Sequence, residues 1–396
     1  MRRVHVQDGK RDEDKGQVRG GDRPRHHGEV RVRRRGVLNP LFQKNIRAGP
    51  HGPAFFIWPK KIMPKKNLKY AIAAVTLLLL ALSFFLLRKD GESVTYTRSA
   101  MGTVVKLTLM DGDRNNFDLA ASSAFDEIER LEYIFSSYNP QSDLSKISSN
   151  AGAGAVEVSP EVVAVTKEAV RVARLSSGAF DPTVGALGIL WGPSGEKGIV
   201  PDEEEIKKLL PLVDYKEILI EGDNKVGLSR AGMALNLGGV AKGYIAGRAV
   251  DVLMAEGVKR GIVQAGGDMV VFQEDNVSPF TIGIQHPRVK DGLIGEAYVY
   301  NGAVPTSGDY ERFFEKDGIR YHHILDPRTG FPSKGTQGVT LTAKDPTTAD
   351  ALSTAVFVMG PEKGMELIER LDGVEGVIID ENGVARTSSG FTGKIY

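Results

Sequence analysis

The chain of 396 residues contains no cysteine. This absence excludes disulfide bonds, thiolate metal sites and a cysteine nucleophile. It also excludes a lipoprotein-type anchor, because that lipid is attached to a cysteine. The absence is compatible with an extracytoplasmic protein, and any attachment to a membrane must use a different device.

Net charge is almost absent as well, with 51 Lys and Arg against 50 Asp and Glu, but residues 1–66 are crowded with Arg and Lys. A basic end is typical of a nucleic-acid or membrane-surface tail. Residues 1–62 lack apolar periodicity, so we interpret them as a disordered segment. The alternative is a mis-assigned start, because Met63 opens a short basic stretch followed by an apolar run, as at a secreted or anchored N-terminus.

The stretch from Tyr70 to Leu87 is uncharged and almost wholly apolar. As a helix it would be about 27 Å long, enough to cross the hydrocarbon layer. Lys65, Lys66 and Lys69 precede it, and positive charge stays on the cytoplasmic side. We therefore expect residues 63–90 to form an uncleaved anchor in the cytoplasmic membrane, with residues 93–396 on the extracytoplasmic side.

Residues 93–396 read as a globular α+β domain, because helical and strand patterns are mixed without regular alternation. Apolar residues from Phe117 to Phe135 recur at steps of three and four, which predicts a long amphipathic helix. A second helix is expected after Ser159 and Pro160, with Ser159 as its cap. Further helices are expected over 349–359 and 361–371. Strands are expected over 94–99, 104–110, 217–220, 261–265, 280–285, 297–300 and 339–343.

Asp350 and Thr354 lie four residues apart on a predicted helix, so they share one face. A carboxylate and a hydroxyl placed in this way suit a hard cation such as Mg²⁺. The ordinary alternative is that Asp350 interacts with the helix dipole in the first turn, while Thr354 bonds back to a carbonyl.

A glycine-rich stretch runs from Asn236 to Tyr244 and contains Gly239 and Lys242. Glycines allow a backbone to approach a phosphate, and a helix N-terminus offers free N–H groups to it. A tight turn with a surface lysine explains the same residues. Likewise, the stretch from Ala265 to Asp268 reads first as a hairpin turn.

Histidine ordinarily titrates near neutrality, so His323 is a candidate for moving a proton or binding phosphate, although a structural role is the commoner one. His322 and His323 do not form a metal site together, because alternate strand residues point to opposite faces. Residues 326–330 read as a turn. Phe180 and Asp181 could stack on and bond to a planar heterocycle, or else form a helix C-cap with a buried ring.

Each pattern is weak alone, but eight of them occur in order along one chain. In that order the chain resembles the ApbE family of FAD:protein FMN transferases, over roughly residues 93–390. The motifs are Met101-Gly102-Thr103, Ser137-Tyr138-Asn139-Pro140, Gly178-Ala179-Phe180-Asp181-Pro182-Thr183, Leu237-Gly238-Gly239-Val240-Ala241-Lys242-Gly243, Gly266-Gly267-Asp268, Thr306-Ser307-Gly308-Asp309-Tyr310, His323-Ile324-Leu325-Asp326-Pro327-Arg328-Thr329-Gly330 and Ala349-Asp350-Ala351-Leu352-Ser353-Thr354.

This resemblance implies a T-fold-like α+β body that binds FAD as a substrate. It implies that Mg²⁺ is held by Asp350, Thr354 and the backbone carbonyl of Gly239, and that His323 and Asp350 are catalytic. The residues that it places beside FAD are Met101, Tyr138, Ala179, Phe180, Asp181, Asn236 and Lys242.

The implied reaction transfers FMN to a Thr or Ser hydroxyl of an acceptor protein and releases AMP. Family acceptors are extracytoplasmic redox-complex subunits with an Asp-x-x-Ser/Thr-Gly-Ala-Thr/Ser motif, which this chain does not contain. Two departures stand out. Asn236 replaces an aspartate that is frequent in the family, and the usual anchor cysteine is missing.

Three other functions compete with transfer to a protein. A metal-dependent FAD diphosphatase would use the same site with water as the acceptor. A flavin-binding protein without turnover would need no metal to activate the diphosphate. A nucleic-acid-binding protein is suggested only by the basic N-terminus, without aromatic or motif support.

Overall fold

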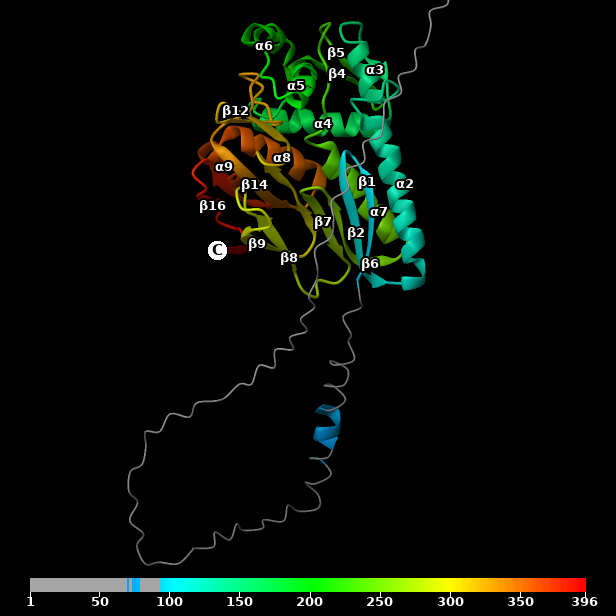
Figure 1. The fold of residues 1–396 in the computed structure, drawn as a ribbon. Helices are drawn as coiled ribbons and strands as arrows, with labels where there is room; N and C mark the ends of the chain where they lie inside the picture. Colours follow the sequence, from blue (N-terminus) through cyan, green and yellow to red (C-terminus); the bar gives the residue numbers. More distant parts are fainter. Residues whose placement is uncertain (1–69, 71–72, 79–92) are drawn as a thin grey trace, which may run out of the picture. The chain divides into compact units, whose positions relative to one another are not determined.

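The computed structural model describes Tyr70, residues 73–78 and residues 93–396 (Figure 1). Tyr70 and residues 73–78 are helical. Across these described ranges, no helix is both long and apolar enough to cross a membrane. The rest of the predicted anchor, and the predicted disordered segment 1–62, lie outside the described residues. Both predictions therefore stay predictions.

A nine-stranded antiparallel sheet forms the centre of residues 93–396, in the order β1-β2-β6-β7-β10-β14-β15-β16, with β11 also paired to β14. The mixture of helices with antiparallel sheets confirms the α+β prediction. The strands are β1 (Val94–Ala100), β2 (Thr103–Gly112), β6 (Val258–Ala265), β7 (Asp268–Gln273), β10 (Gly302–Val304), β11 (Thr306–Gly308), β14 (Thr336–Ala343), β15 (Val374–Asp380) and β16 (Ala385–Thr387).

Four helices cover one face of this sheet: α2 (Phe117–Phe135), α7 (Ala241–Ala255), α8 (Pro346–Met359) and α9 (Pro361–Glu369). Helix α7 packs on β6 and β7, and α8 packs on β14 (Figure 1). The predicted apolar face of α2 is buried, from Phe117 through Ile128 to Phe135. This layer brings the first turns of α7 and α8 together.

The other face of the sheet carries a small sheet of β17 (Gly393–Ile395), β9 (Leu293–Val299) and β8 (Phe280–Gln285). Buried and exposed residues alternate along β8, and Phe280 and Ile282 pack against Val271 of β7. The fold is thus layered, with the large sheet between helices and a small sheet.

A helical lobe lies at one end of the large sheet (Figure 1). It contains α3 (Asp143–Ser149), α4 (Pro160–Leu175), α5 (Gly185–Glu196), α6 (Glu203–Leu209) and a sheet of β3 (Val156–Glu157), β5 (Lys225–Leu228) and β4 (Ile218–Glu221). Short 3₁₀ turns are η1 (Arg114–Asn116), η2 (Leu210–Leu212) and η3 (Tyr215–Glu217). A hairpin of β12 (Phe313–Lys316) and β13 (Ile319–His322) packs against this lobe.

An aromatic cluster joins the lobe to that hairpin. The Trp191 ring of α5 stacks on Tyr321 at 6.1 Å between centroids and meets the edge of Phe331 at 5.9 Å. Its indole N–H donates to the carbonyl of Gly330 at 2.8 Å. The segment around His322 and His323 is therefore fixed to α5.

The start of α4 corrects one prediction. Pro160 is its first residue, as expected, and Ser159 occupies the cap position, but the Ser159 side chain makes no capping bond. Its hydroxyl donates instead to Oδ2 of the buried Asp143 at 2.5 Å. A buried carboxylate needs such donors, so it takes the hydroxyl from the helix end.

Candidate active site

Asp350 and Thr354 of α8 face the glycine-rich loop that leads into α7. Oδ2 of Asp350 accepts a hydrogen bond from the backbone N–H of Gly243 at 2.9 Å. The hydroxyl oxygen of Thr354 lies 3.1 Å from the position that a Cβ on Gly239 would take. Nζ of Lys242 lies 3.9 Å from Oδ1 of Asp350. The structure thus brings together Asp350, Thr354, Gly239 and Lys242, while their roles toward a metal and FAD stay predictions.

The position at which α8 begins excludes the alternative that Asp350 lies in its first turn and interacts with its dipole. The helix begins at Pro346 rather than at 349, capped by the Asp345 side chain, and its first turn holds no acidic residue. Asp350 lies one turn further in and is 2% exposed. Its carboxylate interacts with the N-terminal turn of a different helix, α7, where the partial positive charge favours an anion.

Close packing between α7 and α8 explains why position 243 is glycine. A Cβ there would lie 2.1 Å from the carbonyl oxygen of Pro346 and 2.8 Å from Cβ of Asp350. Both atoms are held in place by α8, so neither can move away without displacing the helix. Glycine is therefore what allows Asp350 to reach the backbone of α7.

We expect Gly243→Ala to lower the free energy of unfolding by about 3 kcal/mol, the upper range for overpacking a core. It should also displace Asp350 and lower activity. Thermal melting with activity measurement checks both effects. Gly192→Ala is the matched control, because nothing lies within 4 Å of a Cβ at Gly192 in α5. Equal melting temperatures for the two variants would contradict the packing argument.

A chain of hydroxyls orients Thr354. Ser353 donates to the carbonyl of Asp350 at 2.8 Å, and Oγ of Ser307 lies 2.8 Å from Oγ of Ser353. A hydroxyl has one proton, so Ser307 must donate to Ser353. Thr354, 3.4 Å from Ser307, can then donate to Ser307 and keep its lone pairs for another partner.

These atoms fit a hard cation. The donor set combines the Asp350 carboxylate, the Thr354 hydroxyl and the adjacent backbone at Gly239, all of them oxygens of the kind that Mg²⁺ prefers. Among the described residues there is no group of three or more His, Cys, Asp or Glu side chains placed to hold a metal. Mg²⁺ tolerates so few protein ligands, because it usually completes its shell with water and substrate phosphates.

The β6–β7 hairpin brings a second carboxylate to Lys242. Ala265 pairs with Asp268 across a two-residue turn, which confirms the hairpin interpretation. Oδ2 of Asp268 accepts a hydrogen bond from the Lys242 ammonium, and Oδ1 accepts one from the backbone N–H of Thr306 at 3.1 Å. Asp268 is 4% exposed. It therefore links α7 to the segment that carries Ser307.

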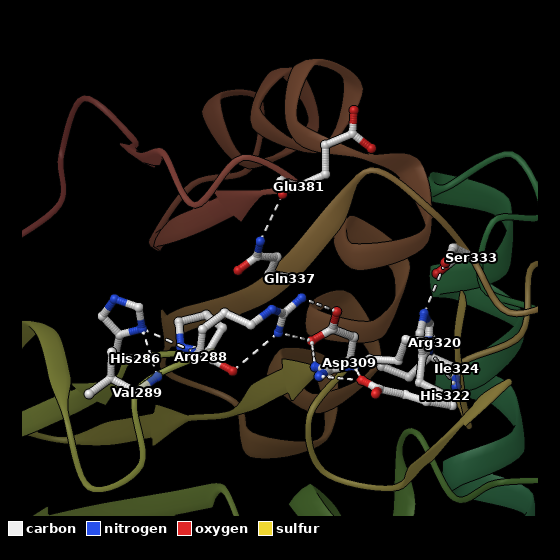
Figure 2. Close-up of polar contacts among 12 residues, drawn as sticks. His286, Arg288, Val289, Asp309, Arg320, His322, Ile324, Ser333, Gln337 and Glu381 are labelled. Atoms are coloured by element: carbon white, nitrogen blue, oxygen red, sulfur yellow. Dashed lines mark hydrogen bonds and ion pairs between the residues drawn. The ribbon is translucent and has the colours of Figure 1, made fainter. Parts of the chain in front are cut away.

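Asp309 fixes that segment on its other side (Figure 2). Its carboxylate accepts two hydrogen bonds from the Arg288 guanidinium, at 2.8 and 2.6 Å. Arg320 of β13 lies 3.5 Å away and shares the same carboxylate. The Asp309 N–H donates to the carbonyl of Gln337 at 3.1 Å. A bidentate arginine pair gives geometric definition, so the position of Ser307 is well determined.

The two histidines differ in burial, because His322 is buried and His323 is exposed. His322 is buried; its Nε2 donates to the carbonyl of Ser333 at 2.9 Å and its Nδ1 accepts from the N–H of Ile324 at 3.3 Å. These bonds fit a neutral ring, and burial lowers the pKa of His322. His322 is therefore structural.

His323 keeps an exposed face, while its backbone N–H donates to the carbonyl of Arg312 at 3.1 Å. Loss of water on its packed side, aided by the neighbouring His322 ring and by the charges of Arg312 and Lys242, lowers the pKa of His323 to about 4. Its ring is therefore neutral at physiological pH and able to accept a proton.

Of the residues expected beside FAD, Phe180 contacts this cluster, and the segment of Met101 is linked to His323 through Arg312. The ring of the buried Phe180 lies 3.2 Å from the position of a Cβ on Gly239, and Ala179 is buried next to it. Met101 has a left-handed backbone, and the carbonyl of Gly102 accepts a bond from Arg312 at 3.0 Å. Their contacts with FAD stay predictions.

Three others are not joined to the cluster by a described contact. Tyr138 is 92% exposed in the turn after α2. Asp181 is buried and its carboxylate accepts bonds from Thr183 and from the N–H of Tyr215, while burial raises its pKa. Asn236 accepts from the N–H of Gly238 at 2.8 Å. Asp181 and Asn236 thus shape their own loops, and their role toward FAD is untested.

Three residues of the site were not among the sequence predictions. Asp268 and Ser307 stood inside motifs, but only their contacts with Lys242 and Thr354 reveal a role. Arg312 gave no sequence signal. Its side chain and backbone connect Gly102 with His323, segments that are 221 residues apart in number.

A cavity of about 570 Å³ lies elsewhere, between residues 326–334 and the junction of α8 and α9. Its two carboxylates are already paired, Asp326 with Arg328 and Glu362 with Arg386. It lacks the buried carboxylate–hydroxyl arrangement at Asp350, so we place the chemistry at the Asp350 cluster.

Comparisons with known proteins find relatives over most of the described chain. A model of the ApbE family matches residues 101–378. The FAD:protein FMN transferase of Treponema pallidum is 33% identical over 295 residues, covering 70% of this chain and 81% of the relative. The solved ApbE protein of Thermotoga maritima is 37% identical, with a TM-score of 0.70, covering 75% of this chain and 97% of that one. The flavin transferase ApbE of Vibrio cholerae is 29% identical, with a TM-score of 0.67 and the same coverage.

Proposed function

Because this chain belongs to the ApbE family and is a transferase of flavin from FAD to acceptor proteins, we propose that it forms a phosphoester between FMN and a Thr or Ser hydroxyl. The observation that carries this proposal is the meeting of Asp350 and Thr354 with Gly239 and Lys242. Such a cluster suits a diphosphate and its cation.

The cation in this proposal is Mg²⁺, held by Asp350, Thr354 and the backbone carbonyl of Gly239. When bound, it neutralises charge on the diphosphate and polarises the reacting phosphorus–oxygen bonds. Lys242, half-buried in the first turn of α7, supplies a second positive charge toward the phosphates. In this proposal, the residues that would line the flavin and adenosine parts are Met101, Tyr138, Ala179, Phe180, Asp181 and Asn236.

The reaction balances as a displacement at the FMN phosphorus. The acceptor hydroxyl oxygen forms a bond to that phosphorus, and the bond from phosphorus to the bridging oxygen breaks. AMP leaves with the bridging oxygen and its electron pair. His323, neutral and exposed on one face, accepts the hydroxyl proton directly or through water. Asp350 is the alternative proton acceptor.

We further propose that the enzyme acts at the outer face of a cytoplasmic membrane, anchored through residues 63–90. The basic residues before the apolar stretch support this orientation. Its partner would then be an extracytoplasmic redox subunit with an Asp-x-x-Ser/Thr-Gly-Ala-Thr/Ser motif.

The test is incubation of the protein with FAD, Mg²⁺ and an acceptor that carries this motif. We expect a fluorescent acceptor band that survives denaturation, a mass increase of one FMN and one AMP released per label. Free FMN with AMP and an unlabelled acceptor would support the diphosphatase instead. Bound, unchanged FAD would support a binding protein without turnover.

A further inference from the structure

Lys242 lies between two buried carboxylates, Asp268 and Asp350, and interacts more closely with Asp268. Its ammonium makes a close hydrogen bond to Asp268, whereas Oδ1 of Asp350 is 3.9 Å away. Asp350 keeps that oxygen outside hydrogen-bond range, while its other oxygen accepts the N–H of Gly243. The position of the Lys242 ammonium therefore decides which of the two carboxylates remains free to bind a metal ion.

Asp268 is fixed in place by the fold. It is the first residue of β7, paired with Ala265, and its Oδ1 accepts the N–H of Thr306. Lys242, by contrast, has a long side chain that is 35% exposed and can change rotamer. Asp268 therefore has a fixed position, and the Lys242 ammonium moves to contact it.

Without the charge of Asp268, the ammonium would turn to Asp350, its other close carboxylate. Attraction between such groups is strong where water is scarce, and a buried carboxylate gains from any partner. Lys242 would then neutralise the oxygen that the cation needs. Metal affinity would then decrease, while the stability of the fold would change little.

We propose that Asp268 is a positioning residue that holds Lys242 away from Asp350 and so keeps the Asp350 carboxylate available to a divalent cation. This inference rests on the proposed function, because it takes Asp350 as a cation ligand. It assigns to the β6–β7 hairpin a role in setting metal affinity, although the hairpin donates no ligand.

The test uses the full-length protein and Mn²⁺ as the probe, with bound metal measured by electron paramagnetic resonance. Asp268→Asn keeps an oxygen that can accept the N–H of Thr306 but removes the charge. We expect it to weaken Mn²⁺ binding about tenfold, a coupling typical of contacting charged groups. Asp268→Glu keeps the charge and should stay within about threefold of the wild type.

A double-mutant cycle with Lys242→Met separates this mechanism from a general loss of negative charge. If Lys242 is the competitor, Asp268→Asn should change Mn²⁺ binding by less than about threefold when Lys242 is already methionine. An equal tenfold loss in both backgrounds would overturn the proposal, and so would wild-type affinity in Asp268→Asn. If Asp268→Asn does not fold, Lys242→Met alone still tests the proposal. Removing a competitor should not weaken Mn²⁺ binding, so weaker binding in Lys242→Met would also overturn the proposal.

This experiment separates two failures. If Mn²⁺ binds the wild type and flavin transfer occurs, but Asp268→Asn binds equally well, only the positioning role is rejected. If the wild type labels no acceptor protein, the proposed function itself is rejected.

Discussion

Replacing Asp350 with alanine is expected to lower the rate of flavin transfer by about three orders of magnitude. A metal that stabilises transition-state charge contributes several kcal/mol, and each 1.36 kcal/mol changes a rate about tenfold. The variant also leaves the N–H of Gly243 without its acceptor, which costs about 1–3 kcal/mol of stability. Rates of acceptor labelling at saturating FAD, with melting temperatures, measure both losses.

Two matched variants separate chemistry from folding. Asp350→Asn keeps an acceptor for Gly243 and should melt near the wild type, yet lose most of the activity. Asp345→Ala removes the cap of the same helix, costing about 1 kcal/mol of stability, but no predicted metal ligand. If Asp345→Ala proved as inactive as Asp350→Asn, the special role of Asp350 would be refuted.

The second large effect concerns His323. His323→Ala is expected to slow transfer about 10²–10⁴-fold, the usual contribution of a positioned general base. Because the side chain is exposed on one face, its loss should leave the melting temperature almost unchanged. His323→Gln has a similar size and can form hydrogen bonds but cannot accept the proton, so it should be comparably slow. Nearly full activity in His323→Gln would argue against proton transfer.

The pH dependence follows from the pKa of His323. The base acts only when neutral, and its pKa is lowered to about 4, so kcat/KM should be constant above about pH 5 and fall below pH 4. This profile reports the free enzyme. In the complex with FAD, the negative diphosphate favours the protonated ring, so the acidic limb of kcat should lie at higher pH. A kcat/KM profile with its limb near the ordinary histidine pKa, about 6.5, would contradict the packed environment.

Long periodic elements were predictable from the sequence. The apolar residues of α2 recur over 117–135 and the observed helix has the same limits, because a sustained stripe must face a core. The predicted range 349–359 starts too late for α8, because the helix begins at Pro346 and the Asp345 side chain caps it. An aspartate followed by proline is itself a helix start signal. The missed β12–β13 hairpin turns at Asp317 and Gly318, both with positive φ. That dipeptide is a strong hairpin signal.

The candidate site was only partly predictable. Helical spacing placed Asp350 and Thr354 on one face, and the glycine-rich stretch suggested a phosphate-binding turn at Gly239 and Lys242. Only the family resemblance joined these two segments in one site. The contact between Lys242 and Asp268 depends on how α7 packs against the β6–β7 hairpin, a tertiary relation that neither segment records by itself. For the same reason, no motif or spacing indicates that Arg312 bridges Gly102 and His323.

The aromatic cluster at Trp191 has a mechanical consequence. The rings of Trp191 and Tyr321 hold the strand that ends one residue before His323 against α5. Asp350 and Thr354 belong instead to the helix layer on the large sheet. The His322 ring at the end of the same strand meets the ring of Phe357 of α8 edge-on, at 5.5 Å between centroids. The strand next to His323 is therefore packed between α5 and the helix that carries Asp350 and Thr354. In the proposed mechanism, removing one of these rings would shift His323 relative to Asp350 without changing either residue.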